Sequence, residues 1–322
     1  MIFSTHPLHP EVTAALQAVA PFRIASAPTP QAIATESTDA AIIVVRAPIP
    51  VAVIARAAGL RALIRHGAGL DMIPVPEATA AGVLVANVPG ANALTVAEHV
   101  IWTALALLRR HPQVNRDLRT HGWAAGRAHA DAGQELSGKT LGVLGMGNIG
   151  RALARMAVQG FGMPVLCHTR TPTGVPQGVT AVSLADLLAQ SDILALCAPL
   201  TDETRGMIDA AALARMKPGA IVANVARGPL VDEAALIAAL ARGHLGGAAL
   251  DVFDTQPLPA DHPFFALPNV ILTPHMAGVT EESMLRMGQG VLAEVRRVLA
   301  GDLPVNLVNP DAVARYRRRF AA

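Results

Sequence analysis

The segment from Gly145 to Gly150 has the spacing Gly-x-Gly-x-x-Gly and stands between an apolar run and a predicted helix. In that setting Gly145 permits a tight turn, Gly147 lets the backbone approach a ligand, and Gly150 lets the helix pack closely on the strand. The N-terminus of a helix offers N–H groups and a partial positive charge, which suit phosphate oxygens. We therefore expect a dinucleotide pyrophosphate to bind at Gly145, Gly147, Asn148, Ile149 and Gly150.

The end of the next predicted strand carries no acidic residue. In a dinucleotide-binding domain, an acidic side chain about 20 positions after the first glycine binds the ribose 2′-hydroxyl of NAD. This chain has His168, Thr169 and Arg170 at that place. A guanidinium group, assisted by neighbouring donors, holds a 2′-phosphate through charge-assisted hydrogen bonds. The sequence therefore favours NADP(H) and leaves NAD(H) open.

Two series of short apolar runs alternate with helix-like stretches, which predicts βαβ units and parallel sheets. The first series places strands at 2–4, 22–25, 41–45, 62–66 and 83–86, with helices at 11–20, 50–58 and 76–81. The second places strands at 141–144, 165–167, 179–182, 193–197, 221–224, 248–250 and 270–272, with helices at 151–159, 184–189, 210–216 and 233–241. We expect an α/β fold with a Rossmann-type doubly wound parallel sheet domain and a discontinuous flavodoxin-like α/β domain.

The remaining stretches connect these two series. Residues 95–98 (Thr-Val-Ala-Glu) have the capping-box form and predict the start of a long apolar helix, buried almost all round, that ends near Leu108. Residues 111–137 are polar and are expected to form a connecting region, whereas an amphipathic helix at about 281–300 returns to the first domain. The predicted domains are 1–95 with 285–322 for the substrate and 96–284 for the dinucleotide.

Composition and charge exclude several classes of protein. The 322 residues include 26 Lys and Arg against 24 Asp and Glu, a net charge of +2 that excludes a dedicated nucleic-acid binder. No apolar run is long enough for a membrane span, and neither HExxH nor CxxC occurs, so we expect no membrane association and no metal. Cys167 and Cys197 lie in apolar runs, which indicates a cytoplasmic, reducing compartment. The basic run at 315–319 is expected to be a solvated tail.

Five further motifs accompany the glycine-rich segment. They are RHGAGLD at 65–71, VAEH at 96–99, NVARG at 224–228, DVFDTQP at 251–257 and TPHMAG at 273–278. In this order and spacing the chain, from about residue 40 to 300, resembles the D-isomer-specific 2-hydroxyacid dehydrogenase family, of the glyoxylate/hydroxypyruvate reductase type. The resemblance implies an NAD(P)-dependent enzyme that reduces a small 2-oxo acid to the D-2-hydroxy acid.

The resemblance also implies which residues meet the substrate. Arg227 matches the family's substrate arginine, and its planar guanidinium fits a carboxylate and polarises an adjacent carbonyl. His275 matches the acid/base and can pass a proton to the carbonyl oxygen near neutral pH. Gly67, Ala68 and Gly69 resemble the loop whose backbone N–H groups bind the substrate carboxylate.

Further cofactor-binding residues follow from the same resemblance. Asp251 resembles a residue near the nicotinamide carboxamide, and Ala198 and Pro199 begin a loop that resembles one along the cofactor. Val225, Ala226 and Gly278 complete the expected set. The resemblance also implies a homodimer, with residues 100–135 in its interface.

One position departs from the family pattern. The residue expected to pair with His275 is a glutamate, and this chain has Gln256 there. A glutamine orients an imidazole by hydrogen bonding but adds no negative charge to stabilise the imidazolium ion. We therefore expect a lower pKa for His275 than in a glutamate-paired relative.

Two other functions stay open. Formate dehydrogenases, a branch of the same superfamily, carry a Gln–His pair, and the expected substrate residue Asn92 resembles an asparagine of that branch. Their hydride abstraction needs no proton transfer, but they typically carry a longer N-terminal extension, which this sequence does not show. The other alternative is a non-catalytic NAD(P)-sensing protein like the corepressor branch, which the presence of both Arg227 and His275 disfavours.

Overall fold

The computed structural model describes residues 1–56 and 58–320 and divides into two compact units. Unit 1 comprises Met1–Asn92 and Val279–Ala322, and unit 2 comprises Ala93–Gly278. The sequence places the corresponding boundaries near residues 95 and 285. Unit 1 is discontinuous, because the chain leaves it after Asn92 and returns to it at Val279.

Unit 1 contains a five-stranded parallel sheet with the strand order β2-β1-β3-β4-β5. Its strands are β1 (Ile2–Ser4), β2 (Phe22–Ile24), β3 (Ile42–Val45), β4 (Ala62–Arg65) and β5 (Leu84–Ala86). This is the flavodoxin-like order, which reverses direction between β1 and β3. The apolar runs form strands here because helices cover both faces, so that β1 and β3 are buried along their whole length.

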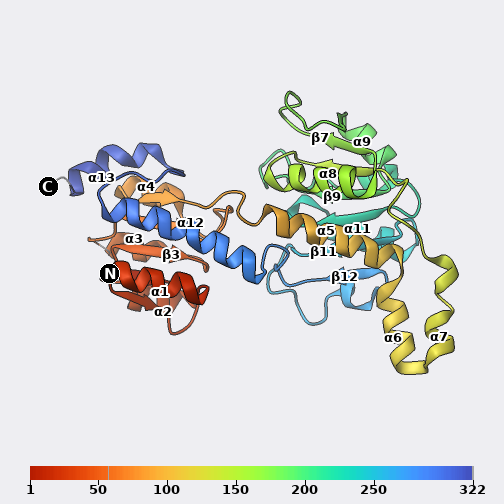
Figure 1. The fold of residues 1–322 in the computed structure, drawn as a ribbon, viewed down its shortest axis with the longest axis horizontal. Helices are drawn as coiled ribbons and strands as arrows, with labels where there is room; N and C mark the ends of the chain where they lie inside the picture. The colour runs from red at the N-terminus through yellow and green to blue at the C-terminus, as the bar shows by residue number, and fades with distance from the viewer. Residues whose placement is uncertain (57, 321–322) are drawn as a thin grey trace. The chain divides into compact units, whose positions relative to one another are not determined.

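Helices cover the two faces of this sheet (Figure 1). On one face lie α1 (Pro10–Val19), α12 (Glu281–Leu299) and α13 (Val313–Phe320), the last preceded by the 3-10 turn η4 (Pro310–Ala312). On the other face lie α2 (Pro30–Glu36), α3 (Val51–Arg56) and α4 (Val75–Ala81). The sequence did not predict α2, and the predicted helix 50–58 extends over residue 57, which lies outside the described residues.

The basic run at 315–319 is not the solvated tail that the sequence predicts. It belongs to α13, whose Tyr316 is 5% exposed and packs in the core of unit 1. Arg315 and Arg319 donate to the carbonyl oxygens of Ala80 and Ala81, at the C-terminal end of α4. Positive charge is favourable there because the helix dipole is negative at that end. The prediction failed because the many arginines of this segment obscured the amphipathic pattern of the helix.

Unit 2 contains a seven-stranded parallel sheet with the order β12-β11-β10-β9-β6-β7-β8. Its strands are β6 (Leu141–Leu144), β7 (Val165–His168), β8 (Val179–Ala181), β9 (Ile193–Leu196), β10 (Ile221–Asn224), β11 (Gly247–Leu250) and β12 (Val270–Leu272). The order is that of a Rossmann-type sheet and reverses between β6 and β9. Because all strands are parallel, their carboxyl ends share one edge, where such sheets bind ligands.

Helices also cover both faces of the sheet in unit 2. One face carries α5 (Ala93–Leu108) and α8 (Asn148–Phe161), and the other carries α9 (Leu184–Gln190), α10 (Ala210–Arg215) and α11 (Glu233–Ala241). Two 3-10 turns, η2 (Gly228–Leu230) and η3 (Pro263–Ala266), follow β10 and β11. The predicted α/β class, with one Rossmann-type and one flavodoxin-like sheet, is confirmed.

The helix α5 differs from its prediction in two ways. It begins at Ala93, so Thr95 is buried inside the first turn and does not cap it. The helix is also not buried all round, because Leu94 and Trp102 are 42% and 52% exposed.

Among the described residues, no helix combines the length and the apolar character that crossing a membrane requires.

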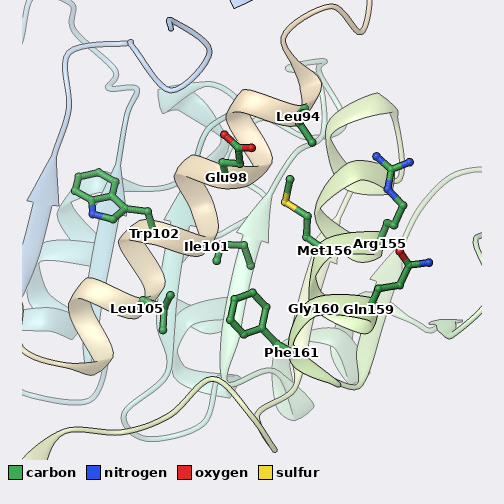
Figure 2. A pocket seen from close by; sticks show the side chains of 10 residues that line it. All are labelled: Leu94, Glu98, Ile101, Trp102, Leu105, Arg155, Met156, Gln159, Gly160 and Phe161. Atoms are coloured by element: carbon green, nitrogen blue, oxygen red, sulfur yellow. The ribbon is translucent and has the colours of Figure 1, made fainter. Parts of the chain in front are cut away.

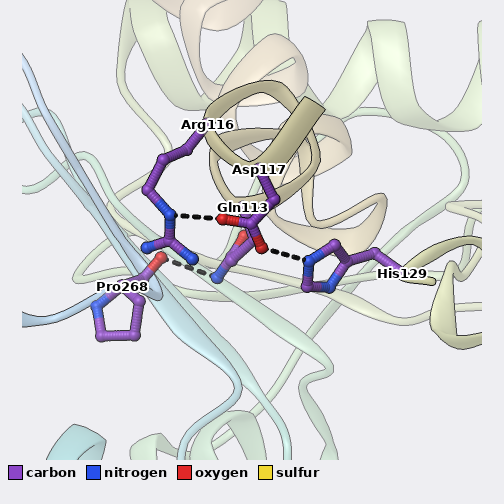
Figure 3. Close-up of polar contacts among 5 residues, drawn as sticks. All are labelled: Gln113, Arg116, Asp117, His129 and Pro268. Atoms are coloured by element: carbon purple, nitrogen blue, oxygen red, sulfur yellow. Dashed lines mark hydrogen bonds and ion pairs between the residues drawn. The ribbon is translucent and has the colours of Figure 1, made fainter. Parts of the chain in front are cut away.

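Residues 111–137, predicted as a connecting region, contain helices. These are α6 (His111–His121), α7 (Trp123–Arg127) and the 3-10 turn η1 (Ala130–Ala132). Figure 3 shows the contacts that fix α6: Arg116 Nε donates to Asp117 at 2.7 Å, and His129 Nε2 lies 2.7 Å from the other carboxylate oxygen. These partners lower the pKa of Asp117 to about 2. The helix was missed because α6 buries no residue and so shows no apolar stripe.

Candidate active site

The glycine-rich loop joins β6 to α8 and is tightly packed. Gly145 has φ +95°, and a Cβ there would come within 2.7 Å of the Ala198 backbone. A Cβ on Gly150 would come within 2.2 Å of the Gly145 carbonyl oxygen. A Cβ on Gly147, by contrast, would meet no atom within 4 Å. The first and third glycines are therefore required for packing, and the second leaves open space in front of α8.

This loop fits the phosphates of a dinucleotide. Gly147 is the N-cap residue of α8, and no side chain caps the helix. The first turn, which begins at Asn148 and Ile149, therefore has no side-chain cap for its N–H groups, and the space beside Gly147 is open. An anion placed there would receive these donors and the positive end of the helix dipole.

The end of β7 lies beside the glycine-rich loop. The backbone N–H of Gly145 donates to the His168 carbonyl oxygen at 2.9 Å. The His168 ring is held by Val182, whose carbonyl oxygen lies 3.1 Å from Nδ1. His168, which the sequence predicts to lie near the ribose of the cofactor, is thus a neighbour of the glycine-rich loop, which the sequence predicts to bind the pyrophosphate.

Arg170 is exposed just beyond β7, next to the half-buried Thr169. A second arginine reaches the same region, because Arg151, in the first turn of α8, donates to the Gly174 carbonyl oxygen at 2.8 Å. No sequence motif indicated Arg151. It ties α8 to the loop that carries Arg170 and adds positive charge there.

The loops after β9 and β10 reach the same edge of the sheet. Ala198 is buried against Gly145, and Pro199 follows it at the surface. Val225 is half-buried and Ala226 is buried directly after β10. The structure therefore brings the predicted cofactor residues of these loops to the edge that carries the glycine-rich loop.

Arg227 stands between β10 and η2. Its backbone carbonyl accepts from the buried Asn224 Nδ2 at 2.9 Å, and its Nη1 donates to the preceding carbonyl oxygen at 2.6 Å. A Cβ on Gly228 would come within 2.0 Å of the Phe253 carbonyl carbon. Only glycine therefore lets the Arg227 loop lie directly against the loop after β11, which carries Gln256.

Gln256 and His275 are hydrogen-bonded to each other. His275 Nδ1 lies 3.0 Å from Gln256 Oε1. The amide nitrogen of Gln256 donates to the Phe253 carbonyl oxygen at 3.3 Å, which turns the amide oxygen toward the imidazole. Nδ1 is then the donor of this pair, and Nε2 is the ring nitrogen that can exchange a proton with a substrate.

Asp251 organises the loop that carries His275. Its two carboxylate oxygens accept from Thr273 Oγ1 at 2.7 Å and from the backbone N–H groups of Met276 at 2.8 Å and Ala277 at 2.9 Å. The side chain is only 2% exposed. The sequence predicts Asp251 as a cofactor residue, and these contacts add a positioning role that it did not predict. This role depends on β11 and β12 being parallel neighbours, which the sequence alone does not show.

The backbone of His275 is unusual. Its φ is +54°, in the left-handed region that few non-glycine residues adopt. The backbone N–H lies within hydrogen-bond distance of the carbonyl oxygens of Asp251, at 2.8 Å, and Thr273, at 3.0 Å. These bonds hold the turn that presents the imidazole. Gly278, a predicted cofactor residue, ends this loop and also ends unit 2.

His99, on α5, approaches the same loop. Its Nε2 lies 3.4 Å from Thr273 Oγ1, and its ring meets Trp102 edge-on at 5.4 Å between centroids. Burial lowers the pKa of His99, and the negative charge of Asp251 opposes that shift. His99 belongs to the VAEH motif, but no sequence pattern indicated its contact with Thr273.

The Gly67–Gly69 loop follows β4 in unit 1. Gly67 has φ +135°, which favours glycine. Arg65 Nε donates to the Gly69 carbonyl oxygen at 3.0 Å, and Asn87 Nδ2 donates to the Ala68 carbonyl oxygen at 2.8 Å. These bonds engage carbonyl groups of the loop, and the Gly67 N–H donates to the Arg65 carbonyl oxygen at 3.0 Å. A carboxylate would therefore be bound by the N–H groups of Ala68 and Gly69.

Asn92 is the last residue of the first segment of unit 1 and is half-buried. The carbonyl oxygen of its neighbour Ala91 accepts from Arg286 Nε of α12 at 3.0 Å. The structure thus groups the predicted residues by unit. The Gly67–Gly69 loop and Asn92 belong to unit 1, and all the other predicted site residues belong to unit 2.

Residues 101–277 match the family model described as D-isomer specific 2-hydroxyacid dehydrogenase, NAD binding domain. The chain is 41% identical over 279 residues to a D-3-phosphoglycerate dehydrogenase of Mycobacterium bovis, covering 86% of this chain and 52% of that protein. It is 39% identical over 279 residues to a glyoxylate reductase of Korarchaeum cryptofilum, covering 85% of this chain and 84% of that protein.

Two solved structures are similar to this one over almost their whole length. An NADPH-dependent glyoxylate/hydroxypyruvate reductase from Sinorhizobium meliloti has a TM-score of 0.85 at 29% identity, with 97% of this chain and 98% of that chain covered. An NAD-dependent formate dehydrogenase from Staphylococcus aureus has a TM-score of 0.82 at 28% identity, with 94% and 96% covered.

The chain belongs to the D-isomer specific 2-hydroxyacid dehydrogenase family. Members of this family are oxidoreductases that use a nicotinamide cofactor, and the matched segment, residues 101–277, is their NAD binding domain. The chain spans about half the length of the D-3-phosphoglycerate dehydrogenases that it matches.

Proposed function

We propose that this protein reduces a small 2-oxo acid, of the glyoxylate or hydroxypyruvate type, to the D-2-hydroxy acid with NAD(P)H. The Gln256–His275 pair carries the proposal, because its hydrogen bond makes Nδ1 the donor to Gln256 and so makes Nε2 the ring nitrogen that exchanges a proton with a substrate. The names of the glyoxylate reductase relatives support the substrate class. Loss of NADPH absorbance with glyoxylate or hydroxypyruvate tests the proposal.

In this mechanism the reduced nicotinamide, when bound, supplies the hydride. Arg227 binds the substrate carboxylate through its planar fork and polarises the adjacent carbonyl. His275 donates the Nε2 proton to the carbonyl oxygen as negative charge develops there. Gln256 keeps Nδ1 protonated and the ring oriented, and Asp251 holds the loop that carries the ring.

The two units have separate roles in this proposal. Unit 2 is the dinucleotide-binding domain, which the family match to residues 101–277 supports. Unit 1 is the substrate domain, whose Gly67–Gly69 loop and Asn92 bind the acid. The free thiols of Cys167 and Cys197 support a reducing, cytoplasmic location.

We infer that NADPH is preferred over NADH because Arg170 and Arg151 place positive charge beyond β7. Replacing Arg170 with Gln is expected to raise the Kd for NADPH by about 10- to 100-fold and to leave the Kd for NADH within about threefold, since the lost contact is a charged hydrogen bond to phosphate. Fluorescence titration of both cofactors measures this. Exposed Arg242→Gln is the control, and equal losses for both cofactors would refute the assignment.

Replacing Gln256 with Glu is expected to extend the alkaline limb of the pH profile for reduction. A carboxylate beside Nδ1 stabilises the imidazolium ion, so the His275 pKa should rise by about one unit or more. Reduction uses protonated His275, so kcat/KM should persist to higher pH. Profiles from pH 5 to 10 measure this, with Gln256→Asn as the neutral control. Superimposable alkaline limbs would contradict the proposed role of the pair.

The alternative is formate oxidation. The Gln256–His275 pair also fits this reaction, and a formate dehydrogenase is among the structural neighbours. Formate with NAD or NADP separates the two functions. Cofactor reduction by formate, together with no reduction of any 2-oxo acid, would replace the primary proposal.

We further infer a homodimer built on α5, α6 and α7. Both tryptophans of the chain lie exposed there, Trp102 at 52% and Trp123 at 77%. A groove of about 640 Å³ lies between α5 and α8 and is lined by Ile101, Trp102 and Phe161 among others. Figure 2 shows the side chains that line it. Exposed tryptophans beside an apolar groove are typical of protein interfaces. We propose that a second copy of this chain binds to this surface.

Replacing Trp102 with Asp is expected to raise the dimer Kd by about 30-fold or more, as for a buried aromatic at the centre of an interface. Light scattering across a concentration series measures the mass. Phe265→Asp is the matched control, because Phe265 is 58% exposed in η3, outside this surface. A monomeric wild-type protein, or dissociation by the control alone, would refute the interface.

A further inference from the structure

The peptide between Phe253 and Asp254 connects two parts of the candidate active site in unit 2. Its carbonyl oxygen, that of Phe253, accepts from the amide nitrogen of Gln256 at 3.3 Å. A Cβ on Gly228, the residue after Arg227, would come within 2.0 Å of the carbonyl carbon and 2.4 Å of the Asp254 nitrogen. The orientation of this peptide therefore determines how the Gln256 side chain lies relative to the Arg227 loop.

The N–H group of the same peptide is bound by Glu233, the first residue of α11. The backbone N–H of Asp254 donates to Glu233 Oε1 at 2.9 Å. A hydrogen bond to an ionised carboxylate is stronger than one between neutral groups. The peptide is therefore fixed at both of its polar atoms, and Glu233 fixes it from outside the loop.

Glu233 is itself held in place by His262. Glu233 Oε2 lies 3.4 Å from His262 Nε2, and both side chains are mostly buried. His262 Nδ1 accepts from the backbone N–H of Phe264 at 3.3 Å, so in the neutral ring Nε2 carries the proton and donates toward the carboxylate. The His262 ring also packs on the buried Phe264 ring, at 4.7 Å between centroids. The carboxylate is therefore anchored to the core of unit 2 through η3.

The charges near Asp254 oppose a further carboxylate at this place. Burial raises the pKa of Asp254, the negative charges of Glu233 and Asp232 raise it further, and Arg205 opposes the shift. Glu233 and Asp254 therefore repel each other. Capping of α11 does not require Glu233 to face this repulsion, because Asp232 caps the helix by accepting from the Ala235 N–H at 3.0 Å. The contacts indicate that Glu233 serves the Asp254 N–H.

We propose that Glu233 is a positioning residue for proton transfer, which orients the Phe253–Asp254 peptide and, through it, the Gln256 amide that keeps Nδ1 of His275 protonated. The role rests on the proposed function, in which His275 delivers the proton from Nε2. Without the carboxylate the peptide can rotate, and its carbonyl oxygen then no longer holds the Gln256 amide nitrogen. The amide oxygen is then free to turn away from the imidazole, so the ring is no longer restricted to one tautomer.

Nitrogen-15 NMR of the full chain, labelled at histidine, reads the tautomer of His275 without catalysis. The His275 signals are assigned by their loss in His275→Asn, and spectra are taken above the pKa of this ring. The wild type is expected to show the Nδ1–H tautomer. Glu233→Ala should shift the tautomer ratio toward Nε2–H by about 2- to 10-fold, the effect of losing one hydrogen bond.

Three further variants separate the hydrogen bond from charge and from stability. Glu233→Asp keeps the charge but is one methylene shorter, so it should shift the ratio as Ala does; it also guards against misfolding of the Ala variant. Glu233→Gln loses the charge but can still accept from the Asp254 N–H, so it should restore the wild-type tautomer. Asp209→Ala removes the N-cap of α10 in the same unit and should leave the tautomer unchanged.

A double-mutant cycle then links Glu233 to turnover. We expect Glu233→Ala to lower kcat for reduction of a 2-oxo acid by about 10-fold and to leave the Kd for NADPH within about threefold. In a Gln256→Ala background the same substitution should lower kcat by at most about twofold, because both residues act through the same contact with His275.

Several results would overturn the positioning role of Glu233. These are a wild type in the Nε2–H tautomer, an unshifted ratio in Glu233→Ala, an equal shift in Asp209→Ala, and additive losses of kcat in the cycle. A Gln variant that behaves like Ala would assign the effect to charge and would also overturn the role. A shifted tautomer in Glu233→Ala, together with a wild type that reduces no 2-oxo acid, would support the positioning of His275 and refute the proposed function.

Discussion

Replacing His275 with Asn is expected to lower kcat for reduction of a 2-oxo acid by about 10²- to 10⁴-fold, the range for loss of a general acid. Asparagine tolerates the left-handed backbone at this position, where φ is +54°, so the turn should survive. The amide can still contact Gln256 but cannot deliver a proton at neutral pH. The Kd for NADPH should stay within about threefold, because the glycine-rich loop is untouched.

The matched control is His121→Asn, at an exposed histidine near the end of α6. It should leave kcat unchanged. Single-turnover measurement of NADPH oxidation separates the chemical step from product release, and circular dichroism confirms folding. A His275→Asn variant that keeps more than about a third of the wild-type rate in the chemical step would show that another group supplies the proton.

Replacing Arg227 with Lys is expected to lower kcat/KM by about 10²- to 10³-fold, the effect of removing a preorganised donor to a developing oxyanion. Lysine keeps the positive charge but lacks the planar fork that binds a carboxylate with two parallel hydrogen bonds. The substitution spares Gly228, so the contact of this loop with Phe253 should persist. The substitution should therefore lower kcat/KM for the 2-oxo acid and leave the affinity for the cofactor unchanged.

Arg242→Lys, at an exposed arginine just after α11 in unit 2, is the control for this substitution. Steady-state kinetics over a range of 2-oxo acid concentrations give kcat and KM separately. A loss confined to NADPH binding, with normal kcat/KM at saturating cofactor, would assign Arg227 to the cofactor instead of the substrate.

The sequence predicts those features that depend on local pattern. Apolar runs and the spacing of Gly145, Gly147 and Gly150 predict the strands and the phosphate loop, because one strand and one helix determine that geometry. The same local reasoning failed at α6 and α13. In α6 no apolar stripe exists to be detected, and in α13 the arginines pair with carbonyl oxygens at the end of α4, a partner distant in sequence.

Features that depend on the alignment of distant strands were not predictable. Asp251 contacts Thr273 and the two N–H groups after His275 only because β11 and β12 are parallel neighbours. The alignment of His6, Arg46 and His66, which follow three neighbouring strands of unit 1, likewise requires the register of β1, β3 and β4. Each residue alone resembles an ordinary surface or core position, and only the topology brings them together.

The most direct measurement is the reduction of a panel of 2-oxo acids, each with NADPH and with NADH, followed by chiral analysis of the product. The panel includes glyoxylate, hydroxypyruvate and 3-phosphohydroxypyruvate, with formate oxidation run in parallel. We expect NADPH-dependent reduction of at least one 2-oxo acid to a D-2-hydroxy acid, lost in His275→Asn, and no turnover of formate. Tight binding of NADPH without reduction of any panel member, or turnover of formate alone, would contradict the proposed function.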